Sequence, residues 1–385
     1  GSGTKLWFDG REVSMAGATL AHAMTIDSLD IHDTCMEVKG HCGVSLIPAA
    51  LNTISCSKQP VTGRELITTL VMGYDMATRS GKALHGTSCD FHSSGAWSVL
   101  GTASIVARYK GLNHEQTRHA LGIAEYYAPR SQLMRDVDYP TMVKDGSGWG
   151  AMTGVSAGLM AAEGFTGAPA LTMEADDAIH YWDNLTQFWE VTTQVFKPYA
   201  VCYWGQAAIA GALGIQAENN LAIDDIKRIE VRTFHEGTRL ATRRPRTTDE
   251  AQYSLPFPVA AALVHHELRF EQLNGEALND PVVLDLVDRI EMVEDEVFNA
   301  RFPKQRLARV VVETTDGAVY DSGELSPKWG INEPATDEEL SGKFHELADG
   351  ILPSSRAREL EEAIWNVAEM EDVSKLTDLL APGLD

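Results

Sequence analysis

The densest group of side chains able to do acid–base chemistry lies between residues 27 and 42. It combines carboxylates, imidazoles, a hydroxyl and a thiol: Asp27, Asp30, His32, Asp33, Thr34, Glu37, His41 and Cys42. Carboxylates and imidazoles in one short stretch can exchange protons with a substrate or bind a metal ion. A solvated turn has a similar composition, so spacing alone leaves a functional and a structural interpretation open.

A second polar segment stands directly before a long apolar stretch. It contains imidazoles, a carboxylate and hydroxyls: His85, Ser88, Asp90, His92, Ser93 and Ser94. One of these residues is expected to cap the helix that follows, and the start of that helix could hold an anion. Taken alone, His92 is more often an ordinary surface or core histidine.

Two further places carry positive charge. Lys144 precedes a Gly-rich helix start, where a lysine suits carboxylate binding or, if partly desolvated, acts as a base. A solvated loop lysine is the alternative. Arg243, Arg244 and Arg246 form the most basic run of the chain, which is either solvent-exposed or a clamp for a carboxylate.

Three apparent signatures are set aside. Residues 154–158 match the Gly-x-Ser-x-Gly pattern of a nucleophilic serine, but no strand precedes them, so Ser156 is interpreted as a packing residue. The glycines at 146–150 lack the strand and spacing of a dinucleotide site, and Gly81-Lys82 has no phosphate-loop frame. No nucleotide cofactor is predicted.

The elements that must position these residues are mainly helices. Apolar residues recur at three- and four-residue spacing in three segments, Gly63–Ser80, Trp97–Lys110 and His114–Tyr127. Two further segments, Gly148–Glu163 and Gln206–Ala217, are rich in small residues that let helices approach closely. This half of the chain is predicted to be a compact all-helical domain.

The pattern changes after Leu221. Apolar and polar residues largely alternate over Ile226–Phe234, which predicts a strand, and Asp316-Gly317 marks a turn between Leu307–Thr314 and Ala318–Asp321, which predicts a hairpin. Two segments between them are predicted helices: Val259–Leu268 and Asp280–Ile290. We expect an α+β unit here and a helical tail that starts at Thr336 as N-cap.

Composition narrows the class of partner. The 385 residues include 32 Lys+Arg and 55 Asp+Glu, which gives a formal charge of −23 and argues against nucleic acid or a membrane surface as partner. The 5 cysteines form no Cys-x-x-Cys pair, and the longest nearly apolar run, Ala96–Ala107, is too short to span a bilayer. A cytoplasmic protein is expected.

Several motifs in their order resemble the MmgE/PrpD family over nearly the whole chain. They are Leu20-Ala21-His22-Ala23, Leu29-Asp30-Ile31-His32-Asp33-Thr34, Gly40-His41-Cys42-Gly43, Gly73-Tyr74-Asp75, Phe91-His92-Ser93-Ser94-Gly95, Gly164-Phe165-Thr166-Gly167 and Ala251-Gln252-Tyr253-Ser254-Leu255-Pro256. This sequence departs from the family pattern at His32, where Asp is usual, and at Cys42, where Pro is usual.

The resemblance implies a mainly α fold: a large helical domain, residues 1–196 and 332–385, with a smaller α+β lid, residues 197–331. The active site would lie in the cleft between them, and the first helices of the family would lie upstream of Gly1. The resemblance also implies a homodimer.

The resemblance places the polar active-site residues at Asp30, Thr34, His41, His92 and Lys144. Gln206 stands where the family has a His after its "KxYPxC" motif, and it can hydrogen-bond a substrate but cannot exchange protons near neutral pH. Further candidates for binding the substrate are the cations and one tyrosine that could face the cleft: Arg79, Arg135, Arg244 and Tyr127.

The family reactions make or break a bond at a carbon next to a carboxylate without a redox cofactor. Such chemistry needs cations for the carboxylates, a base for the carbon-bound proton and donors for the developing charge. We therefore expect a cofactor-independent lyase without a metal, a dehydratase of a small di- or tricarboxylate similar to 2-methylcitrate dehydratase. An epimerase, a decarboxylase and a non-catalytic polycarboxylate-binding protein remain open. A metal-dependent hydrolase built on His32, Asp33 and His41 is the least favoured alternative.

Overall fold

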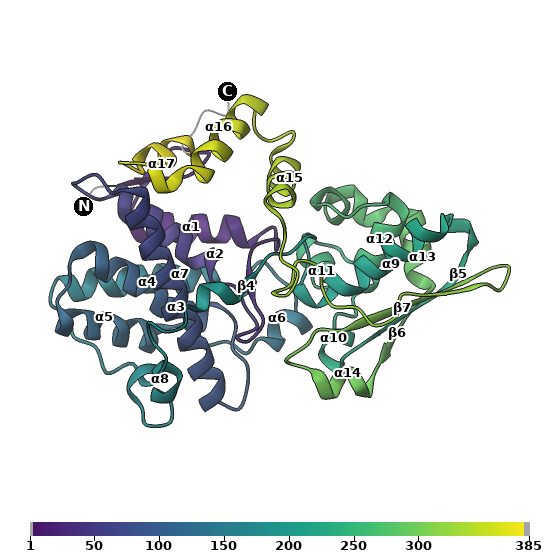
Figure 1. Ribbon diagram of the computed structural model, residues 1–385, viewed down its shortest axis with the longest axis horizontal. Coiled ribbons are helices and arrows are strands. Elements are labelled where there is room, and N and C mark those ends of the chain that lie inside the picture. Colours follow the sequence, from purple (N-terminus) through teal and green to yellow (C-terminus); the bar gives the residue numbers. More distant parts are fainter. Residues whose placement is uncertain (1–2, 381–385) are drawn as a thin grey trace.

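A computed structural model of the chain describes residues 3–380. It confirms the mainly α fold with a smaller α+β part. Figure 1 shows the two parts side by side along the longest axis, with the helical half at one end and the only four-stranded sheet of the described residues at the other. A short antiparallel ladder in the helical half, β3 (Thr34–Cys35) with β4 (Gln194–Val195), lies next to the boundary between them.

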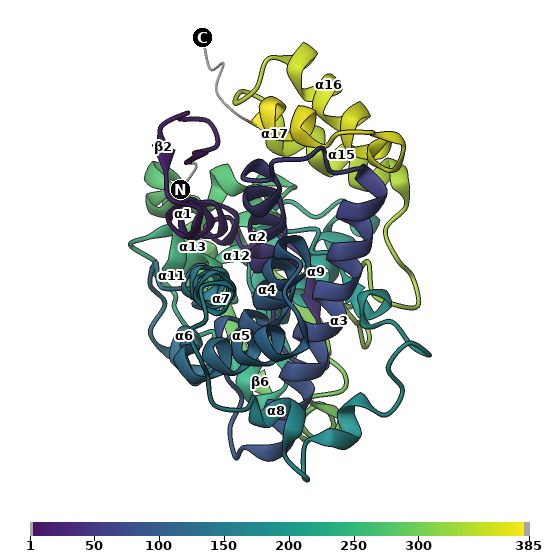
Figure 2. The ribbon, with the colours of Figure 1, turned by 90° about the vertical axis from the view of Figure 1, so that its left-hand side faces the viewer.

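The helical half is built around two helices, α4 (Gly95–Lys110) and α7 (Ser147–Ala162). Figure 2 shows α4 surrounded by its neighbours. These neighbours are α1 (Met15–Asp27), α2 (Gly43–Ser55), α3 (Gly63–Thr87) and α5 (His114–Tyr127). Small residues permit the close approach of α4 and α7, since a Cβ at Gly154 would lie 2.5 Å from the Val99 carbonyl oxygen. Ser156 lies inside α7 and donates a hydrogen bond to the Met152 carbonyl, which agrees with its interpretation as a packing residue.

Most predicted helices of this half are present, with one clear difference in length. The prediction His114–Tyr127 matches α5, whereas α3 continues to Thr87 instead of ending near Ser80. Gly81 lowers the local helix propensity, but its bare Cα lets α3 pack against Val38 and Trp97. Tertiary packing therefore overrides the local signal.

The sheet of the smaller half has the strand order β6-β5-β7-β8. Strand β5 (Ile226–Thr233) pairs antiparallel with β7 (Ala308–Thr314), and β7 pairs with β8 (Val319–Asp321) in the predicted hairpin. The prediction missed β6 (Ile290–Glu294), a strand parallel to β5. The predicted helix ran to Ile290, whereas α13 ends at Asp288 and Ile290 begins the strand. Three helices pack against this sheet and share its core: α9 (Gln206–Asn219), α12 (Pro256–His265) and α13 (Pro281–Asp288).

The remaining elements are short, apart from those of the tail. They are β1 (Thr4–Lys5), β2 (Glu12–Val13), α6 (Met134–Asp138), α8 (Leu171–Glu174), α10 (His235–Thr238), α11 (Thr248–Gln252), α14 (Glu296–Arg301), α15 (Asp337–Ala348), α16 (Ser354–Trp365) and α17 (Ser374–Leu380).

The tail returns to the helical half. The Val373 amide donates to the Val61 carbonyl, and the Gly63 amide donates to the Met370 carbonyl. Thr336 caps α15 as predicted, in a capping box with Glu339. The chain therefore leaves the helical half once and comes back to it. Among residues 3–380, no helix combines the length and the apolar character that crossing a bilayer requires.

Candidate active site

A small cavity lies where the two halves meet. Its volume is about 40 Å³. The helical half lines it with polar and apolar residues of the loop after α1, of α6 and of the loop before α7: Asp30, Thr34, Cys35, Met36, Lys39, His41, Leu133, Val137 and Asp145. The smaller half contributes Cys202, Tyr203, Trp204, Tyr253 and Arg306. Three residues predicted for the active site, Asp30, Thr34 and His41, thus meet at one cavity.

Asp30 is held by a lysine that lies far from it in the sequence. Lys197 Nζ lies 2.5 Å from Asp30 Oδ1, and both side chains are buried. The β3–β4 ladder explains this contact, since Thr34 pairs with Val195 and so brings Lys197 beside the loop that carries Asp30. Asp30 also has a φ of 48°, a left-handed conformation that Asp tolerates better than most residues.

His41 has one nitrogen fixed by the backbone and one facing a carboxylate. Its Nδ1 lies 2.6 Å from the Asp33 carbonyl oxygen, which can only accept, so Nδ1 carries a proton. Its Nε2 lies 3.2 Å from Asp145 Oδ2. Burial, and then the charge of Lys197, lowers the pKa of His41 and favours the neutral ring.

Ser94 holds this pair in place. Its hydroxyl donates to Asp145 Oδ2 at 3.0 Å and accepts from the His41 amide at 2.9 Å. Ser94 does occupy the N-cap position of α4, but its side chain makes no capping hydrogen bond. The predicted cap is therefore wrong in its chemistry, because the hydroxyl serves His41 and Asp145 instead.

Two further carboxyls next to Asp145 favour their protonated forms. Burial, followed by the neighbouring Asp145, raises the pKa of Asp136 to about 9. Burial also raises the pKa of Asp27 well above its ordinary value, with Asp145 and Asp30 adding to the shift. A proton is therefore available beside the His41–Asp145 contact at neutral pH.

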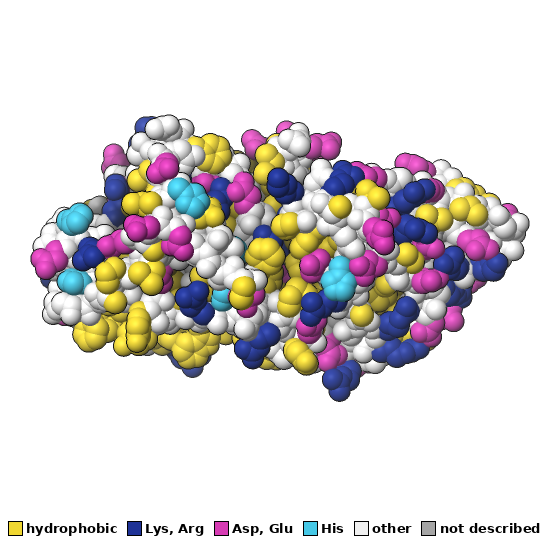
Figure 3. All heavy atoms as spheres, turned by 90° about the horizontal axis from the view of Figure 1, so that it is seen from below, with side chains coloured by type: hydrophobic (Ala, Val, Ile, Leu, Met, Phe, Trp, Pro, Cys, Tyr) yellow, Lys and Arg dark blue, Asp and Glu magenta, His cyan; other side chains and the backbone are white. Residues whose placement is uncertain are grey.

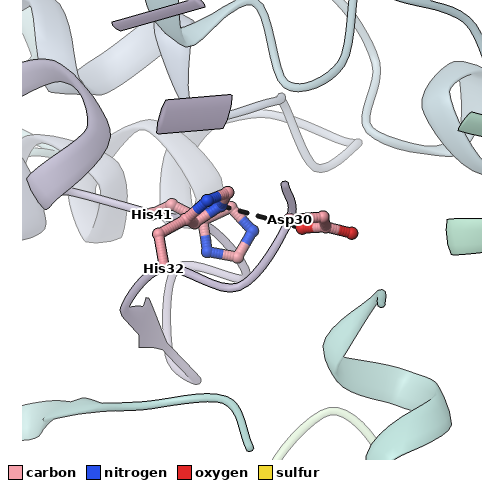
Figure 4. A group of neighbouring side chains, drawn as sticks. All are labelled: Asp30, His32 and His41. Atoms are coloured by element: carbon pink, nitrogen blue, oxygen red, sulfur yellow. Dashed lines mark ion pairs between the residues drawn. The ribbon is translucent and has the colours of Figure 1, made fainter. Parts of the chain in front are cut away.

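His32 lies against His41, with the two rings edge to face and 4.3 Å between their centroids. Figure 4 shows both imidazoles with Asp30, and His32 Nε2 lies 3.7 Å from Asp30 Oδ1. Neither ring nitrogen of His32 has a hydrogen-bond partner among residues 3–380. Burial lowers the pKa of His32 well below its ordinary value, so the ring is neutral.

Asp30, His32 and His41 each offer one atom that could bind a metal ion, and these atoms lie within 4.8 Å of one another. Two imidazoles and a carboxylate are a familiar zinc or iron ligand set. However, the ammonium group of Lys197 already pairs with Asp30 Oδ1, and a dication would lie against that positive charge. The residues present therefore do not fit a resident metal ion.

Lys144 is buried and lies at the boundary, not in a solvated loop. Its Nζ lies 3.0 Å from Asp249 Oδ1 of α11, donates to Gln252 Oε1, and lies 5.6 Å from the centre of the Tyr253 ring. Its positive charge acts on the site, since it opposes protonation of His32. Lys144 thus connects the loop before α7 to the smaller half.

Two of the predicted polar residues are engaged elsewhere. His92 does not line the cavity, and its ring stacks on His85, with 6.3 Å between centroids. The side chain of Gln206 is fully buried and hydrogen-bonds only to backbone groups of the described residues. It accepts from the Tyr199 amide and donates to the carbonyls of Tyr199 and Val201. It fixes the turn before α9 and has no amide atom left for a substrate.

The other predicted substrate-binding residues also lie outside this cavity. Arg79 is buried beside Asp75 and donates to carbonyls of the segment after α8, and Arg244 pairs with Asp288 on the surface. Arg135 and Tyr127 are exposed. The proposed arginine clamp is not formed by Arg243 either, which donates to backbone carbonyls at the end of α13 and the start of β6.

Sequence reasoning missed Lys197, Asp145 and Arg306 as site residues. Lys197 and Tyr253 stand inside motifs that were recognised, and Asp145 directly follows Lys144, so proximity to those motifs was the available signal. No sequence signal pointed to Arg306, because it stands just before a predicted strand, away from the recognised motifs and the polar segments.

The fold and the site together define a mainly helical two-part protein whose buried acid–base groups gather at the junction of its parts. The chain belongs to the MmgE/PrpD family: the MmgE/PrpD N-terminal domain matches residues 1–182, and the MmgE/PrpD C-terminal domain matches residues 199–369. This confirms the resemblance seen in the sequence.

The similar curated proteins are distant in sequence and cover nearly the whole chain. A cis-aconitate decarboxylase-like protein, oryM, of Aspergillus oryzae is 25% identical over 96% of this chain and 83% of its own length. A cis-aconitate decarboxylase of Aspergillus terreus is 22% identical over 96% and 82%. A cis-aconitate decarboxylase of Homo sapiens is 23% identical over 94% and 79%.

Proposed function

We propose that this chain is a cofactor-independent lyase that acts at the carbon next to a carboxylate of a small di- or tricarboxylate. The observation that carries the proposal is the geometry of His41. Its Nδ1 is fixed by the Asp33 carbonyl, and its Nε2 faces Asp145 at 3.2 Å in the wall of the cavity. A neutral imidazole held in one tautomer is suited to moving a proton to or from carbon.

The surroundings of His41 match the needs of such chemistry. Lys197 and Lys144 do not line the cavity and are each paired with a carboxylate, but their buried positive charge would stabilise negative charge that develops on a substrate. The cations of the cavity wall, Lys39 and Arg306, would meet a substrate carboxylate directly. Thr34 lines the cavity; its hydroxyl donates to the Gly40 carbonyl across a long 3.4 Å and would have to turn from it to donate to a substrate. Asp30 holds Lys197 in position. The raised pKa of Asp136 keeps a proton on that carboxyl, and its neighbour Asp145 faces His41 Nε2.

Dehydration is the first candidate reaction, because the site offers a base and an acid together. His41 would take the carbon-bound proton, and the Asp145–Asp136 pair would give a proton to the leaving hydroxyl group, so that an alkene and water form. The proton taken from carbon and the proton given to the hydroxyl group would then both be exchanged at the contact between His41 and Asp145.

Decarboxylation is the second candidate, and the names of the curated relatives favour it. Here a carbon–carbon bond would break, carbon dioxide would leave, and the electron pair left on carbon would take a proton through His41. The same cations would hold the remaining carboxylates.

The test is incubation of the protein with citrate, 2-methylcitrate and cis-aconitate in deuterated water, followed by NMR. A dehydratase forms an alkene from the hydroxy acids, and a decarboxylase forms a product with one carboxylate fewer and deuterium at the neighbouring carbon. Deuterium exchange without net reaction would instead identify an epimerase. Binding without exchange or reaction would contradict the lyase proposal and identify a non-catalytic family member.

His41→Asn should lower the rate of the reaction found in this screen by about 10²–10⁴-fold, the usual contribution of a general acid or base. His114→Asn is the matched control, because His114 is exposed at the start of α5 and away from the cavity. Equal rates in the His41 variant and the control would contradict the role of His41.

A further inference from the structure

A second and larger cavity lies directly outside the candidate active site. Its volume is about 550 Å³, within the range of ligand-binding clefts. Four residues line both cavities, Cys35, Met36, Lys39 and Arg306, so the larger cavity shares a wall with the inner one. Glu37 and Lys304 line only the larger cavity, which we call the outer cavity.

The outer cavity is positively charged, although the chain carries a formal charge of −23. Its lining includes three cations, Lys39, Lys304 and Arg306, and one carboxylate, Glu37. The Glu37 carboxylate pairs at 2.7 Å with Lys82, which also pairs with Glu190, so the charge of Glu37 is compensated in part from outside the cavity. A cleft with an excess of one sign of charge attracts small ions of the opposite sign.

Arg306 is the strongest sign of a missing anion. It is only 3% exposed, and no carboxylate among residues 3–380 forms an ion pair with it. Its guanidinium donates to the backbone carbonyls of Met36 and Pro303, while Nε is buried without a partner. Burial lowers the pKa of Arg306 only to about 10, so the group stays charged at neutral pH. A buried charge without a counterion is costly, and a bound anion would remove that cost.

Lys39 also lines the outer cavity and, like Arg306, has no carboxylate paired with it among the described residues. Its Nζ lies over the Phe91 ring at 3.7 Å and donates to the Glu37 carbonyl, but it makes no ion pair within the described residues. Burial, with the charge of Arg306 adding to it, lowers the pKa of Lys39 to about 8. The backbone of Lys39 is also left-handed, with a φ of 54°, which few lysines adopt without a reason.

We propose that the outer cavity is an anion-binding antechamber, where Lys39, Lys304 and Arg306 bind a carboxylate group of a small polycarboxylate before it enters the inner cavity. The identity of the anion rests on the proposed function, whereas the anion site itself rests on the charge and the missing counterion. The inner cavity of about 40 Å³ is too small for a tricarboxylate, so part of the ligand must occupy the outer cavity unless the halves separate.

The experiment measures the affinity for tricarballylate, a tricarboxylate without a hydroxyl group or a double bond, by isothermal titration calorimetry. Lys304→Gln should weaken binding by about threefold, and Lys39→Gln by about tenfold, because Lys39 is more deeply buried. Arg306→Lys keeps the charge but loses the planar donor pair, and it should weaken binding by about tenfold. The affinity of the unmodified protein should fall as salt is raised.

Lys110→Gln is the control, since Lys110 is an exposed lysine at the end of α4. Thermal unfolding without ligand shows which variants are folded. If Arg306→Lys does not fold, Lys304→Gln still tests the proposal, because Lys304 is exposed and its substitution should not disturb the fold. Unchanged affinity in folded Lys39→Gln and Lys304→Gln would overturn the antechamber, as would an equal loss in Lys110→Gln. Because binding is measured without turnover, a failure of the lyase proposal leaves this result readable on its own.

Discussion

Burial decides where the protons of this site reside. The low-dielectric junction lowers the pKa of His32 and His41 and raises the pKa of Asp27 and Asp136, so that all four favour their neutral forms. Two compact ion pairs, Lys197 with Asp30 and Lys144 with Asp249, carry most of the remaining charge. Neither lysine lines the inner cavity, so the cations that a substrate carboxylate would meet there are Lys39 and Arg306.

Asp136 makes a prediction about stability and pH. Its pKa is about 9 in the folded protein against an ordinary 3.8, so the folded state holds a proton that the unfolded state has released. This contribution to stability is complete below about pH 4 and is lost as pH rises toward 9. Asp136→Asn should therefore gain stability relative to the unmodified protein, by a few kcal/mol, as pH rises from 6 to 9.

Urea unfolding at several pH values measures this difference. Asp138→Asn serves as the control, because Asp138 is an exposed residue at the C-terminal end of the same short helix and pairs with Arg239. A constant stability difference between Asp136→Asn and the unmodified protein over this pH range would show that Asp136 is ionised in the folded state.

The Asp30, His32 and His41 group makes a prediction about metals. Because Lys197 occupies Asp30 Oδ1, we expect a chelator such as EDTA to leave both turnover and thermal stability unchanged. Loss of activity on chelation, restored by one added metal ion, would contradict this and revive the metal-dependent alternative.

Local sequence was a good guide to residues that lie on one loop and a poor guide to their partners. Asp30, Thr34 and His41 fall within twelve consecutive positions, and all line the cavity. Lys197 lies 167 positions from Asp30, and no local pattern states that they touch. Gln206 was a substrate-binding candidate because of its alignment to a family histidine, but the turn before α9 uses all of its amide atoms.

At the scale of elements, the contact between α4 and α7 makes a further prediction. A Cβ at Gly154 would lie 1.8 Å from Thr102 Oγ1 and 2.5 Å from the Val99 carbonyl oxygen, and the latter belongs to backbone that cannot rotate away. Gly154→Ala should lower the free energy of unfolding by about 2–3 kcal/mol through overpacking.

Gly342→Ala is the matched control for the same substitution. Gly342 lies in the exposed helix α15, and a Cβ there meets nothing within 4 Å. The change should stabilise the protein by about 0.5–1 kcal/mol through helix propensity. Chemical denaturation of the two variants tests the expected loss of stability in Gly154→Ala and the expected gain in Gly342→Ala. Stabilisation by Gly154→Ala would contradict the tight contact between α4 and α7.

Elements could be predicted where local and tertiary signals agree. α5 matches its prediction because Asn113 forms a capping box with Gln116 and apolar spacing continues to the end of the helix. The predicted helix Asp280–Ile290 ran two residues past the end of α13 and so took in Ile290, the first residue of β6. The other residues of β6 had no predicted element, because the strand is defined by its pairing with β5.

For the whole molecule, the surface of the helical half makes a prediction about assembly. Large apolar side chains are exposed between the end of α5 and the first turn of α7: Tyr126, Tyr127, Tyr139, Met142, Val143 and Trp149. Figure 3 shows hydrophobic side chains gathered along one edge of the helical half, whereas charges of both signs are interspersed over the smaller half. Such a segment favours burial against another subunit.

We propose that this segment contributes to the contact of a homodimer. Met142→Glu combined with Trp149→Glu should convert a dimer into a monomer in size-exclusion chromatography with light scattering. Val319→Glu, at an equally exposed apolar residue of β8, should leave the mass unchanged. A monomeric unmodified protein, or dissociation by the β8 variant alone, would refute the assignment.

The return of the tail to the helical half limits how the two halves can move. Two stretches of chain cross the boundary, one near Lys197 and one before α15, and a body joined at two points can swing only about the line through them. Lys343 of α15 donates to the carbonyls of Ile31 and Lys197, which ties the second crossing to the first. Opening of the inner cavity is thus a rotation about this double hinge. Lys304 lines the outer cavity together with Thr193 and Ile331 of the two crossing stretches, so it lies close to the hinge and would move little when the site admits a ligand.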